Sequence, residues 1–315
     1  MGKKGKIVIA LAVILGLALV GVGIWLGMGY YRDSQIRFAV NDTLSDGGGQ
    51  KVTVILLGGQ SNASGCSIDA YLQQNVSREK YAEYQNGYDN VYINYLCGNN
   101  RSEAFVKCTT LQGEPAGCFG PELGLAEKLH EAYPDRMFFI IKCAWGGTNL
   151  YDQWLSPASK GKTGQLYKEF SVFVETSLEY LKSKNYDVTV AGMCWMQGES
   201  DSFSPEHAEN YEGNLSNFVS DVRKLVEGYA PAEGMAFADA YIAENPSYWV
   251  YYEAVNRGKK NFAQSSDRNV LVDTVGHGLT CENEPSESPD LAHYDSMSQI
   301  KLGHLFAEAL SPFIQ

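Results

Sequence analysis

The sequence predicts an α/β fold in which a parallel sheet is covered by helices on both faces. Short runs rich in Val and Ile alternate with longer amphipathic stretches, which is typical of this class. The runs are too short to cross a membrane, and their nearly continuous apolar character is typical of buried parallel strands. Polar, glycine-containing segments follow several of them directly. The predicted strands are residues 52–57, 137–142, 188–195, 235–242 and 270–275.

The stretches between these strands have the period of amphipathic helices. Pro121 fits the first turn of one of them, and Pro134 follows its end, as proline positions in and around helices predict. No internal repeat is present, and residues 60–120 are rich in loop-forming residues, so this region is expected to elaborate the surroundings of a site. The predicted helices are residues 121–133, 165–184, 206–229, 248–265 and 296–312.

The composition is that of a globular protein with an acidic surface. Of 315 residues, 44% are hydrophobic and 20% are charged, and the formal net charge is -12, from 25 Lys+Arg and 37 Asp+Glu. This charge argues against nucleic acids and anionic membrane surfaces as partners, because both would repel the chain.

The first residues predict a membrane anchor. Three lysines within residues 3–6 precede an uncharged, apolar run from 7 to 31, which is long enough to span the hydrocarbon core. No small-residue cleavage site follows, so we expect an uncleaved signal anchor with its N-terminus inside and the body outside the cell. The alternative is a cleaved signal and a secreted protein. The predicted organisation is an anchor over 1–31, a flexible linker over 32–50 and one domain over 51–315.

Seven cysteines leave the disulfide content open. Four of them lie in loop-like sequence, so one or two disulfides are possible in an oxidising compartment. Cys143 and Cys194 lie in strand-like runs and are expected to be buried thiols. No zinc-binding spacing occurs, and no metal or organic cofactor is predicted. The four loop cysteines are Cys66, Cys97, Cys108 and Cys118.

Chemistry-bearing residues follow separate predicted strands. Ser61 comes after two glycines at the end of the first strand, where a sharp turn can expose its hydroxyl; alternatively it only caps the next helix. After the second strand, Gly146 and Gly147 form a glycine turn whose N–H groups can bind an oxyanion. After the third, Gln197 can donate its amide N–H, while Glu199 either supports it or is an ordinary charge at a helix N-terminus.

Asp290 and His293 complete the set after the fifth strand. Three residues apart on one turn, they can meet, so that the carboxylate orients the imidazole. His277, which follows the same strand, is the alternative base. The remaining histidines fall within predicted helices.

In combination, these motifs closely resemble the SGNH-hydrolase superfamily, in particular its sialate O-acetylesterase-like and carbohydrate acetylesterase branch. The resemblance covers the chain from about Val52 to the C-terminus, in the family's order. The matching pieces are Gly59-Gln60-Ser61-Asn62, Gly120-Pro121-Glu122, Ala144-Trp145-Gly146-Gly147-Thr148 with Trp154, Gln197-Gly198-Glu199-Ser200-Asp201, and Asp290 with His293.

This resemblance implies a flavodoxin-like three-layer α/β/α sandwich with five parallel strands. It implies Ser61 as nucleophile, His293 as base and Asp290 as its orienting carboxylate. It also implies an oxyanion hole made by the N–H of Ser61, the N–H of Gly147 (less favoured, that of Gly146) and the side chain of Gln197. The implied activity is removal of O-acetyl groups from carbohydrate, through an acetyl-enzyme.

The substrate is less defined by the sequence. Aromatic residues, namely Trp145, Trp154 and the tyrosines of residues 81–95, are candidates for stacking on sugar rings. Sialic acid would require a cation for its carboxylate, and Arg101, Lys107 and Arg257 are candidates. Two other functions remain open: a non-catalytic carbohydrate-binding protein at the cell surface, and an esterase for lipid-like acyl chains. The oligomeric state is not predicted.

Overall fold

The computed structural model describes residues 36–245 and 247–314. The predicted membrane anchor, residues 1–31, lies outside the described residues and stays a prediction. Within the described residues, no helix has both the length and the apolar character that crossing a membrane requires.

The centre of the domain is a mixed sheet of eight strands, in the order β10-β9-β8-β1-β7-β3-β4, with β5 also paired to β3. Six strands run parallel, whereas the two-residue strands β4 and β5 pair with β3 in antiparallel fashion. The strands are β1 (Lys51–Gly59), β3 (Val91–Cys97), β4 (Asn100–Arg101), β5 (Val106–Lys107), β7 (Met137–Ala144), β8 (Asp187–Met196), β9 (Ala236–Ala240) and β10 (Asn269–Val272).

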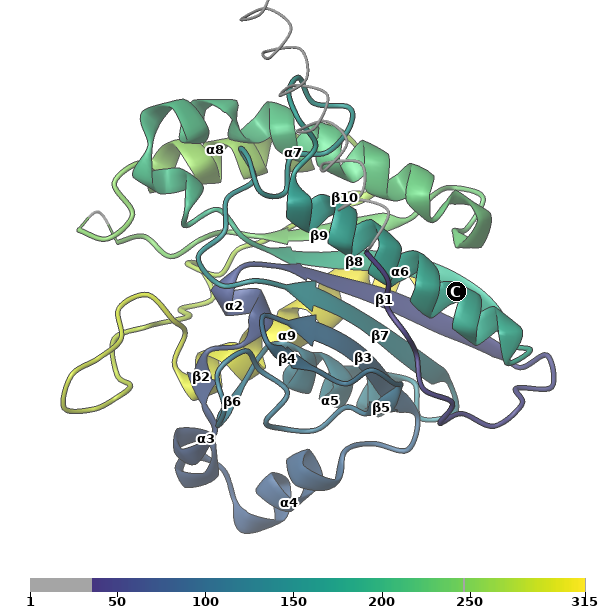
Figure 1. The fold of residues 1–315 in the computed structure, drawn as a ribbon. Helices are drawn as coiled ribbons and strands as arrows, with labels where there is room; N and C mark the ends of the chain where they lie inside the picture. The colour runs from purple at the N-terminus through teal and green to yellow at the C-terminus, as the bar shows by residue number, and fades with distance from the viewer. Residues whose placement is uncertain (1–35, 246, 315) are drawn as a thin grey trace, which may run out of the picture. The chain divides into compact units, whose positions relative to one another are not determined.

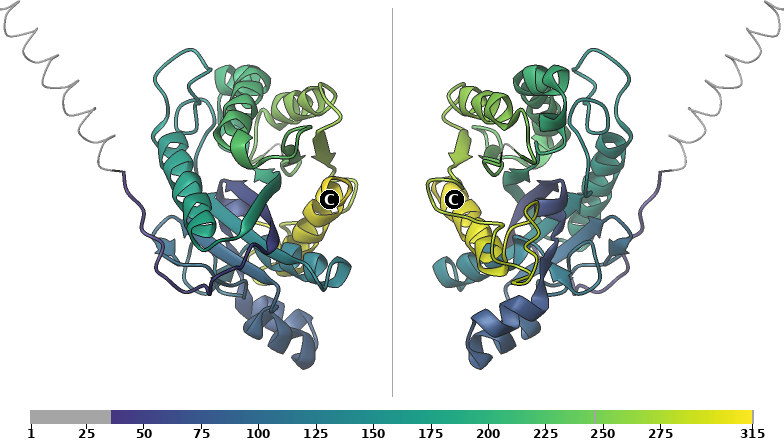
Figure 2. Two further views of the ribbon diagram at one scale, coloured as in Figure 1. Left: turned by 90° about the vertical axis from the view of Figure 1, so that its right-hand side faces the viewer. Right: turned by 90° about the vertical axis from the view of Figure 1, so that its left-hand side faces the viewer.

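Helices cover both faces of this sheet, as Figures 1 and 2 show. One layer contains α6, α7 and α8, and the opposite layer contains α5 and α9, which pack against each other. The short helix α2 contacts the central strands β1, β7 and β8, and the short helices α3 and α4 pack beside α9 and α5. A two-stranded ribbon (β2, Ser67–Ile68, with β6, Cys118–Phe119) also contacts α9. The helices are α2 (Ser61–Ser64), α3 (Asp69–Asn75), α4 (Arg78–Asn86), α5 (Glu122–Ala132), α6 (Gln165–Ser183), α7 (Pro205–Leu225), α8 (Tyr252–Ala263) and α9 (Ser296–Leu310).

The predicted α/β/α layering is confirmed, but the prediction of a five-stranded, purely parallel sheet is wrong. All five predicted strands exist, and β3 adds a sixth parallel strand from the region expected to be loops. Its apolar run is interrupted by Asn94, which is nevertheless fully buried because its amide donates to Ser177 and its carbonyl accepts from Ser102. Because Asn94 interrupts the apolar pattern and its hydrogen-bond partners lie elsewhere in the chain, the sequence did not predict this buried strand.

The segment before β1 is not a free linker where the structure describes it. The backbone N–H of Asn41 donates to the carbonyl of Glu103, and the hydroxyl of Thr43 donates to the carbonyl of Phe105. Further along, Gly47 donates to the carbonyl of Lys184. The polar, glycine-rich composition predicted flexibility, but these backbone groups bond to the body of the domain instead.

None of the seven cysteines forms a disulfide, so the possible pairing of the four loop cysteines does not occur. Cys97 and Cys108 are fully buried in the domain, as are the two strand cysteines, Cys143 and Cys194. Burial raises the pKa of all four thiols, which keeps them protonated at neutral pH.

The central position of β1 places its carboxyl end in the middle of the sheet edge. β1 lies between β7 and β8, and all three strands end at the same level: Gly59 pairs with Ala144 on one side and with Met196 on the other. The segments that follow these three strands therefore meet in space. In open α/β sheets, this carboxyl edge is where ligands bind.

Candidate active site

A sharp turn at the end of β1 positions Ser61. Gly59 has φ = 139°, and a Cβ at this position would lie 1.9 Å from the carbonyl oxygen of Met196, so only glycine fits. The next residue donates its N–H to that same carbonyl at 2.9 Å, which ties the turn to β8. Ser61 then begins the four-residue helix α2 and is 8% exposed.

Ser61 opens into a cavity of about 470 Å³ at the carboxyl edge of the sheet. We call it the Ser61 cavity. Its walls come from the ends of β1, β7 and β8 and from the loop before α9, which are far apart in sequence. It is lined by Gln60, Ser61, Cys66, Asn99, Glu114, Pro115, Gly146, Gly147, Ser200, Phe203, Trp249 and His293.

The predicted histidine and aspartate meet as expected. His293 Nδ1 lies 2.5 Å from Asp290 Oδ2, while the other oxygen of Asp290 accepts the N–H of Ala292 at 3.0 Å. This leaves Nε2 of His293 as the nitrogen free to act in the Ser61 cavity, where Ser61 also lies. The alternative base, His277, is not among the residues that line this cavity.

The glycine turn after β7 distinguishes between its two N–H groups. The N–H of Gly146 donates to Glu114 Oε2 at 2.7 Å and is therefore occupied. The N–H of Gly147, which has φ = 68°, has no hydrogen-bond partner among the described residues. Gly147 is thus the glycine that can donate to a ligand in the Ser61 cavity.

Gln197 is close to this site but does not line the cavity. Its side chain is fully buried, and Nε2 donates to Asp201 Oδ2 at 2.6 Å and to the carbonyl of Thr148 at 2.9 Å. Nε2 also lies 3.2 Å from Gln60 Oε1, and the hydroxyl of Tyr211 donates to Gln197 Oε1 at 3.1 Å. All its polar atoms are engaged within the protein, which is the geometry of a positioning residue.

Gln60 has the properties that were expected of Gln197. Its Oε1 accepts the backbone N–H groups of Gly198 at 3.3 Å and Ser200 at 3.2 Å, as well as Nε2 of Gln197. Because two of these donors are backbone N–H groups, the oxygen must face them and the amide cannot be reversed. Nε2 of Gln60 has no partner among the described residues, and Gln60 lines the cavity. No pattern in the sequence predicts this donor.

Asn62 connects the serine turn to the histidine loop. Its Nδ2 donates to Glu199 Oε1 at 2.9 Å and to the carbonyl of Ala292 at 3.2 Å, and its Oδ1 accepts the N–H of Tyr294 at 3.0 Å. The two residues that it holds flank His293. Glu199 is therefore bonded to Asn62 and not to Gln197, and burial raises the pKa of its carboxyl.

Asp201 is the anchor beneath the glycine turn. Burial raises the pKa of its carboxyl to about 6, although hydrogen bonds from the backbone N–H of Leu150, from Gln197 and from the backbone N–H of Tyr151 act in the opposite direction. This carboxyl ties the segment after β8 to the segment after β7, and so fixes two walls of the Ser61 cavity relative to each other.

The aromatic residues predicted to stack on sugar do not line the Ser61 cavity. Trp154 is fully buried, and its Nε1 donates to the hydroxyl of Thr148 at 2.9 Å, so it supports the glycine turn from beneath. The tyrosines of residues 81–95 and Trp145 are likewise absent from its lining. Instead, Phe203, 59% exposed, and Trp249 form an aromatic wall, with ring centroids 5.3 Å apart.

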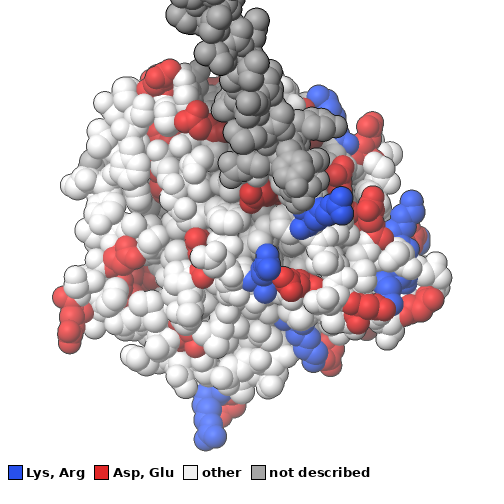
Figure 3. Space-filling model, viewed as in Figure 1, with Lys and Arg blue, Asp and Glu red and all other residues white. Residues whose placement is uncertain are grey.

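The three candidate cations for a sugar carboxylate are engaged elsewhere. Arg101 pairs with Glu103 at 2.8 Å, Lys107 with Asp89, and Arg257 with Glu209 at 3.5 Å. None of these cations lines the Ser61 cavity. Figure 3 shows acidic side chains and no Lys or Arg on the left of the drawn face at the level of α2.

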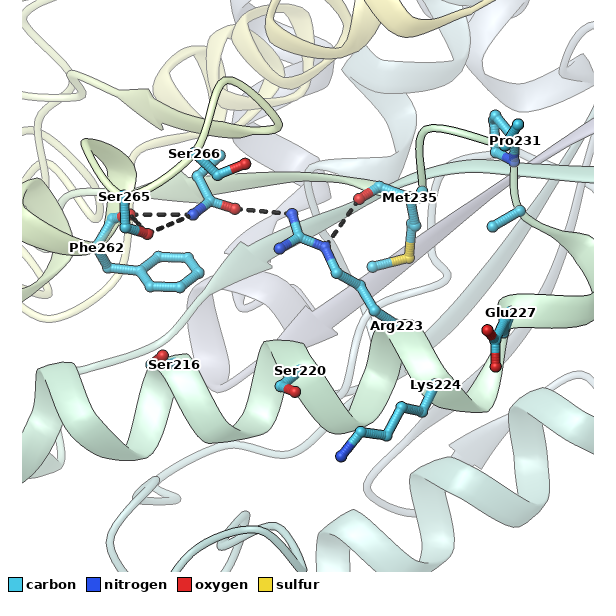
Figure 4. A pocket seen from close by; sticks show the side chains of 14 residues that line it. Ser216, Ser220, Arg223, Lys224, Glu227, Pro231, Met235, Phe262, Ser265 and Ser266 are labelled. Carbon is cyan, nitrogen blue, oxygen red and sulfur yellow. Dashed lines mark hydrogen bonds between the residues drawn. The ribbon is translucent and has the colours of Figure 1, made fainter.

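A larger cavity, of about 670 Å³, lies at the opposite end of the strands, beside the start of β9 and β10. Figure 4 shows that its polar groups bond to one another: Arg223 donates to the carbonyl of Met235 at 3.0 Å and to Asn269 Oδ1 at 2.8 Å. The side chains drawn contain no histidine to activate a serine. Within the described residues, no group of three His, Cys, Asp or Glu side chains is placed to hold a metal ion.

The family model described as carbohydrate esterase, sialic acid-specific acetylesterase matches residues 51–312, which is most of the chain. No curated protein matches the sequence.

Solved structures share the fold at low sequence identity. A protein from Arabidopsis thaliana is 18% identical with a TM-score of 0.60, and the match covers 84% of this chain and 99% of that one. NanS is 16% identical with a TM-score of 0.59, covering 86% and 99%. A carbohydrate acetylesterase from Xanthomonas citri is 15% identical with a TM-score of 0.55, covering 82% and 56%.

Proposed function

The chain belongs to the sialic acid-specific acetylesterase family of carbohydrate esterases, and from this we propose that it removes O-acetyl groups from carbohydrate with Ser61 as the nucleophile. The observation that carries the proposal is the meeting of Ser61 and His293 in one cavity, with Asp290 on the far nitrogen of the imidazole. Three residues in these roles form a serine-hydrolase triad.

In the proposed mechanism, His293 Nε2 takes the proton from Ser61 Oγ as that oxygen attacks the acetyl carbonyl carbon. Asp290 holds Nδ1–H and stabilises the imidazolium that forms. The carbon–oxygen bond to the sugar then breaks, and the sugar oxygen takes the proton from His293. Water repeats the same steps on the acetyl-serine and releases acetate.

The negative charge on the carbonyl oxygen needs preorganised donors. We propose the N–H of Ser61, the N–H of Gly147 and Nε2 of Gln60. The N–H of Gly147 and Nε2 of Gln60 lack partners among the described residues, and all three residues line the Ser61 cavity. Gln197 contributes indirectly in this scheme, by bonding to Gln60 Oε1 and helping to direct its Nε2.

The direct test is acetate release by the full chain from acetylated xylo-oligosaccharides and from O-acetylated sialic acid, with para-nitrophenyl acetate as a general ester. Ser61→Ala should lower kcat by about 10⁴-fold or more, because it removes the nucleophile. Ser200→Ala is the matched control: it removes a hydroxyl from the same cavity and should keep most of the activity.

The outcome also separates the alternatives. Equal acetate release by wild type and Ser61→Ala would refute the serine mechanism. A kcat/KM that rises steeply from para-nitrophenyl acetate to para-nitrophenyl esters of longer acyl chains would favour an esterase for lipid-like acyl groups instead. The position of the domain outside the cell, attached through residues 1–31, remains our proposal from the sequence and is tested by protease accessibility on intact cells.

A further inference from the structure

The Ser61 cavity contains a fixed carboxylate and no cation. Among its described lining residues, Glu114 is the one carboxylate, and there is no Lys or Arg. From this, we propose that the cavity selects uncharged acetylated sugars and discriminates against sugars that carry a carboxylate, sialic acid included, with Glu114 as the specificity-determining residue. The inference rests on the proposed deacetylation. It assigns this chain uncharged sugars, whereas the family is described as specific for sialic acid.

Glu114 is held in place by the turn that bears the oxyanion donors. Its Oε2 accepts the hydroxyl of Ser64 at 2.7 Å and the N–H of Gly146 at 2.7 Å. The backbone approaches it closely on the other side, since a Cβ at Gly98 would lie 2.6 Å from Oε1. Two hydrogen bonds and this close approach therefore hold the carboxylate beside Ser64 and Gly146.

No Lys or Arg among the described residues lines the cavity to offset this charge. The candidates Arg101, Lys107 and Arg257 each pair with an acidic residue elsewhere, as described above. A second, smaller cavity adjoins the first, since both are lined by Cys66 and His293, and it adds Glu284 and Asp290 to the surroundings. The two adjoining cavities are thus lined by three carboxylates, those of Glu114, Glu284 and Asp290.

A sugar carboxylate would enter this field at a cost. Sialic acid is ionised at neutral pH, so the carboxylate of Glu114 repels it. At the effective dielectric of a protein surface and a separation of several ångströms, this repulsion should lower kcat/KM about tenfold. An uncharged pyranose avoids this cost. Its ring faces fit the aromatic wall formed by Phe203 and Trp249, which lie 5.3 Å apart.

The experiment uses one sugar in two charge states. The full chain is assayed for acetate release from O-acetylated sialic acid and from its carboxyl methyl ester, beside an acetylated xylo-oligosaccharide. Wild type should hydrolyse the methyl ester with a kcat/KM about tenfold above that of the free acid. Glu114→Gln should raise kcat/KM for the free acid relative to the ester and close most of this gap.

Two controls isolate the effect. Asp89→Asn removes an equal charge at a residue outside the Ser61 cavity and should leave the ratio of the two substrates unchanged. Because Glu114 also holds Gly146, the ratio of substrates is the readout, and para-nitrophenyl acetate reports any general loss of catalysis.

The proposal would be overturned if wild type hydrolysed the free acid and the methyl ester with equal kcat/KM. So would a ratio that Glu114→Gln leaves unchanged. Failure of the proposed function gives a different result, namely no acetate from any of the substrates, para-nitrophenyl acetate included.

Discussion

Asn62 shows how a single side chain can assemble a site from distant segments. Its amide bonds to Glu199, to the carbonyl of Ala292 and to the N–H of Tyr294, so one residue holds both the segment after β8 and the histidine loop. Its own backbone carbonyl accepts Nε2 of Gln299 in α9. The geometry of the proposed triad therefore depends on an amide to which the proposed mechanism assigns no chemical step.

Gln60 is the proposed side-chain donor to the oxyanion, and its substitution tests that role. Gln60→Ala should lower kcat by about 10²–10³ with little change in KM, since an oxyanion donor acts mainly in the transition state. Steady-state kinetics with para-nitrophenyl acetate measure this. Gln112→Ala is the control, because that buried glutamine bonds to Lys107 and Thr109 outside the cavity's lining.

An unchanged kcat in Gln60→Ala would place the third donor elsewhere, and Gln197 would again be the first candidate. A thermal melt of the same variant separates catalysis from folding. A lowered Tm with normal kcat per folded molecule would mean that the amide only stabilises the turn.

The convergence of the site residues was predictable, because they follow different parallel strands and parallel strands end at one edge of the sheet. Ser61, Gly147, Asp290 and His293 all converge as the sequence suggested, three of them in the Ser61 cavity. The role of Gln60 was not predictable. It depends on which amide atom meets the backbone N–H groups of Gly198 and Ser200, and no pattern in the sequence reports that contact.

At the scale of elements, Glu127 on α5 joins three helices. It accepts the hydroxyl of Tyr84 at 2.7 Å, Nζ of Lys80 at 2.9 Å and a ring nitrogen of His304 at 2.7 Å. Burial alone would raise the pKa of its carboxyl, but these hydrogen bonds outweigh burial and lower it to about 2. The ionised carboxylate thus stabilises the packing of α4 and α9 against α5.

The sign of the pH dependence follows from this lowered pKa. The stabilisation by Glu127 is present above the ordinary carboxyl pKa near 4.5 and is lost as pH falls toward about 2. Glu127→Gln should lower the free energy of unfolding at neutral pH by about 2–3 kcal/mol. Urea unfolding at neutral pH and across this acid range measures both effects. Equal loss of stability on acidification in wild type and variant would contradict it.

The predicted helices and strands begin and end close to the predicted residues, because they are long segments with a clear hydrophobic period. The strand β3 was not found from the sequence, since Asn94 breaks the apolar run and its partners lie on α6 and in the following loop. The strands β4 and β5 contain two residues each, which is too short for any periodic signal.

At the scale of the whole molecule, the net charge of -12 acts on every charged substrate before it reaches the cavity. Hydrolysis of O-acetylated sialic acid should speed up as salt rises from about 0.01 M to about 1 M, because the Debye length falls from about 30 Å to about 3 Å. Hydrolysis of its methyl ester should not change. The measurement is kcat/KM for both substrates across this series.

If kcat/KM for the free acid fell with added salt, the protein would attract this substrate. That result would contradict the proposed electrostatic repulsion. A parallel change for both substrates would indicate a general effect of salt on the enzyme. The layered architecture itself was predictable from the alternation of strands and helices, whereas this distribution of charge around one cavity was not, because it depends on which acids find a basic partner.

The bond between Asn62 and Tyr294 joins residues 232 positions apart. During synthesis, the proposed nucleophile Ser61 and its turn are made early, whereas the proposed base, His293, follows 232 residues later. The proposed triad therefore cannot form until the loop before α9 has been made and has reached the turn that bears Ser61. Under the proposed mechanism, the topology thus delays hydrolysis until this late segment has folded onto the sheet.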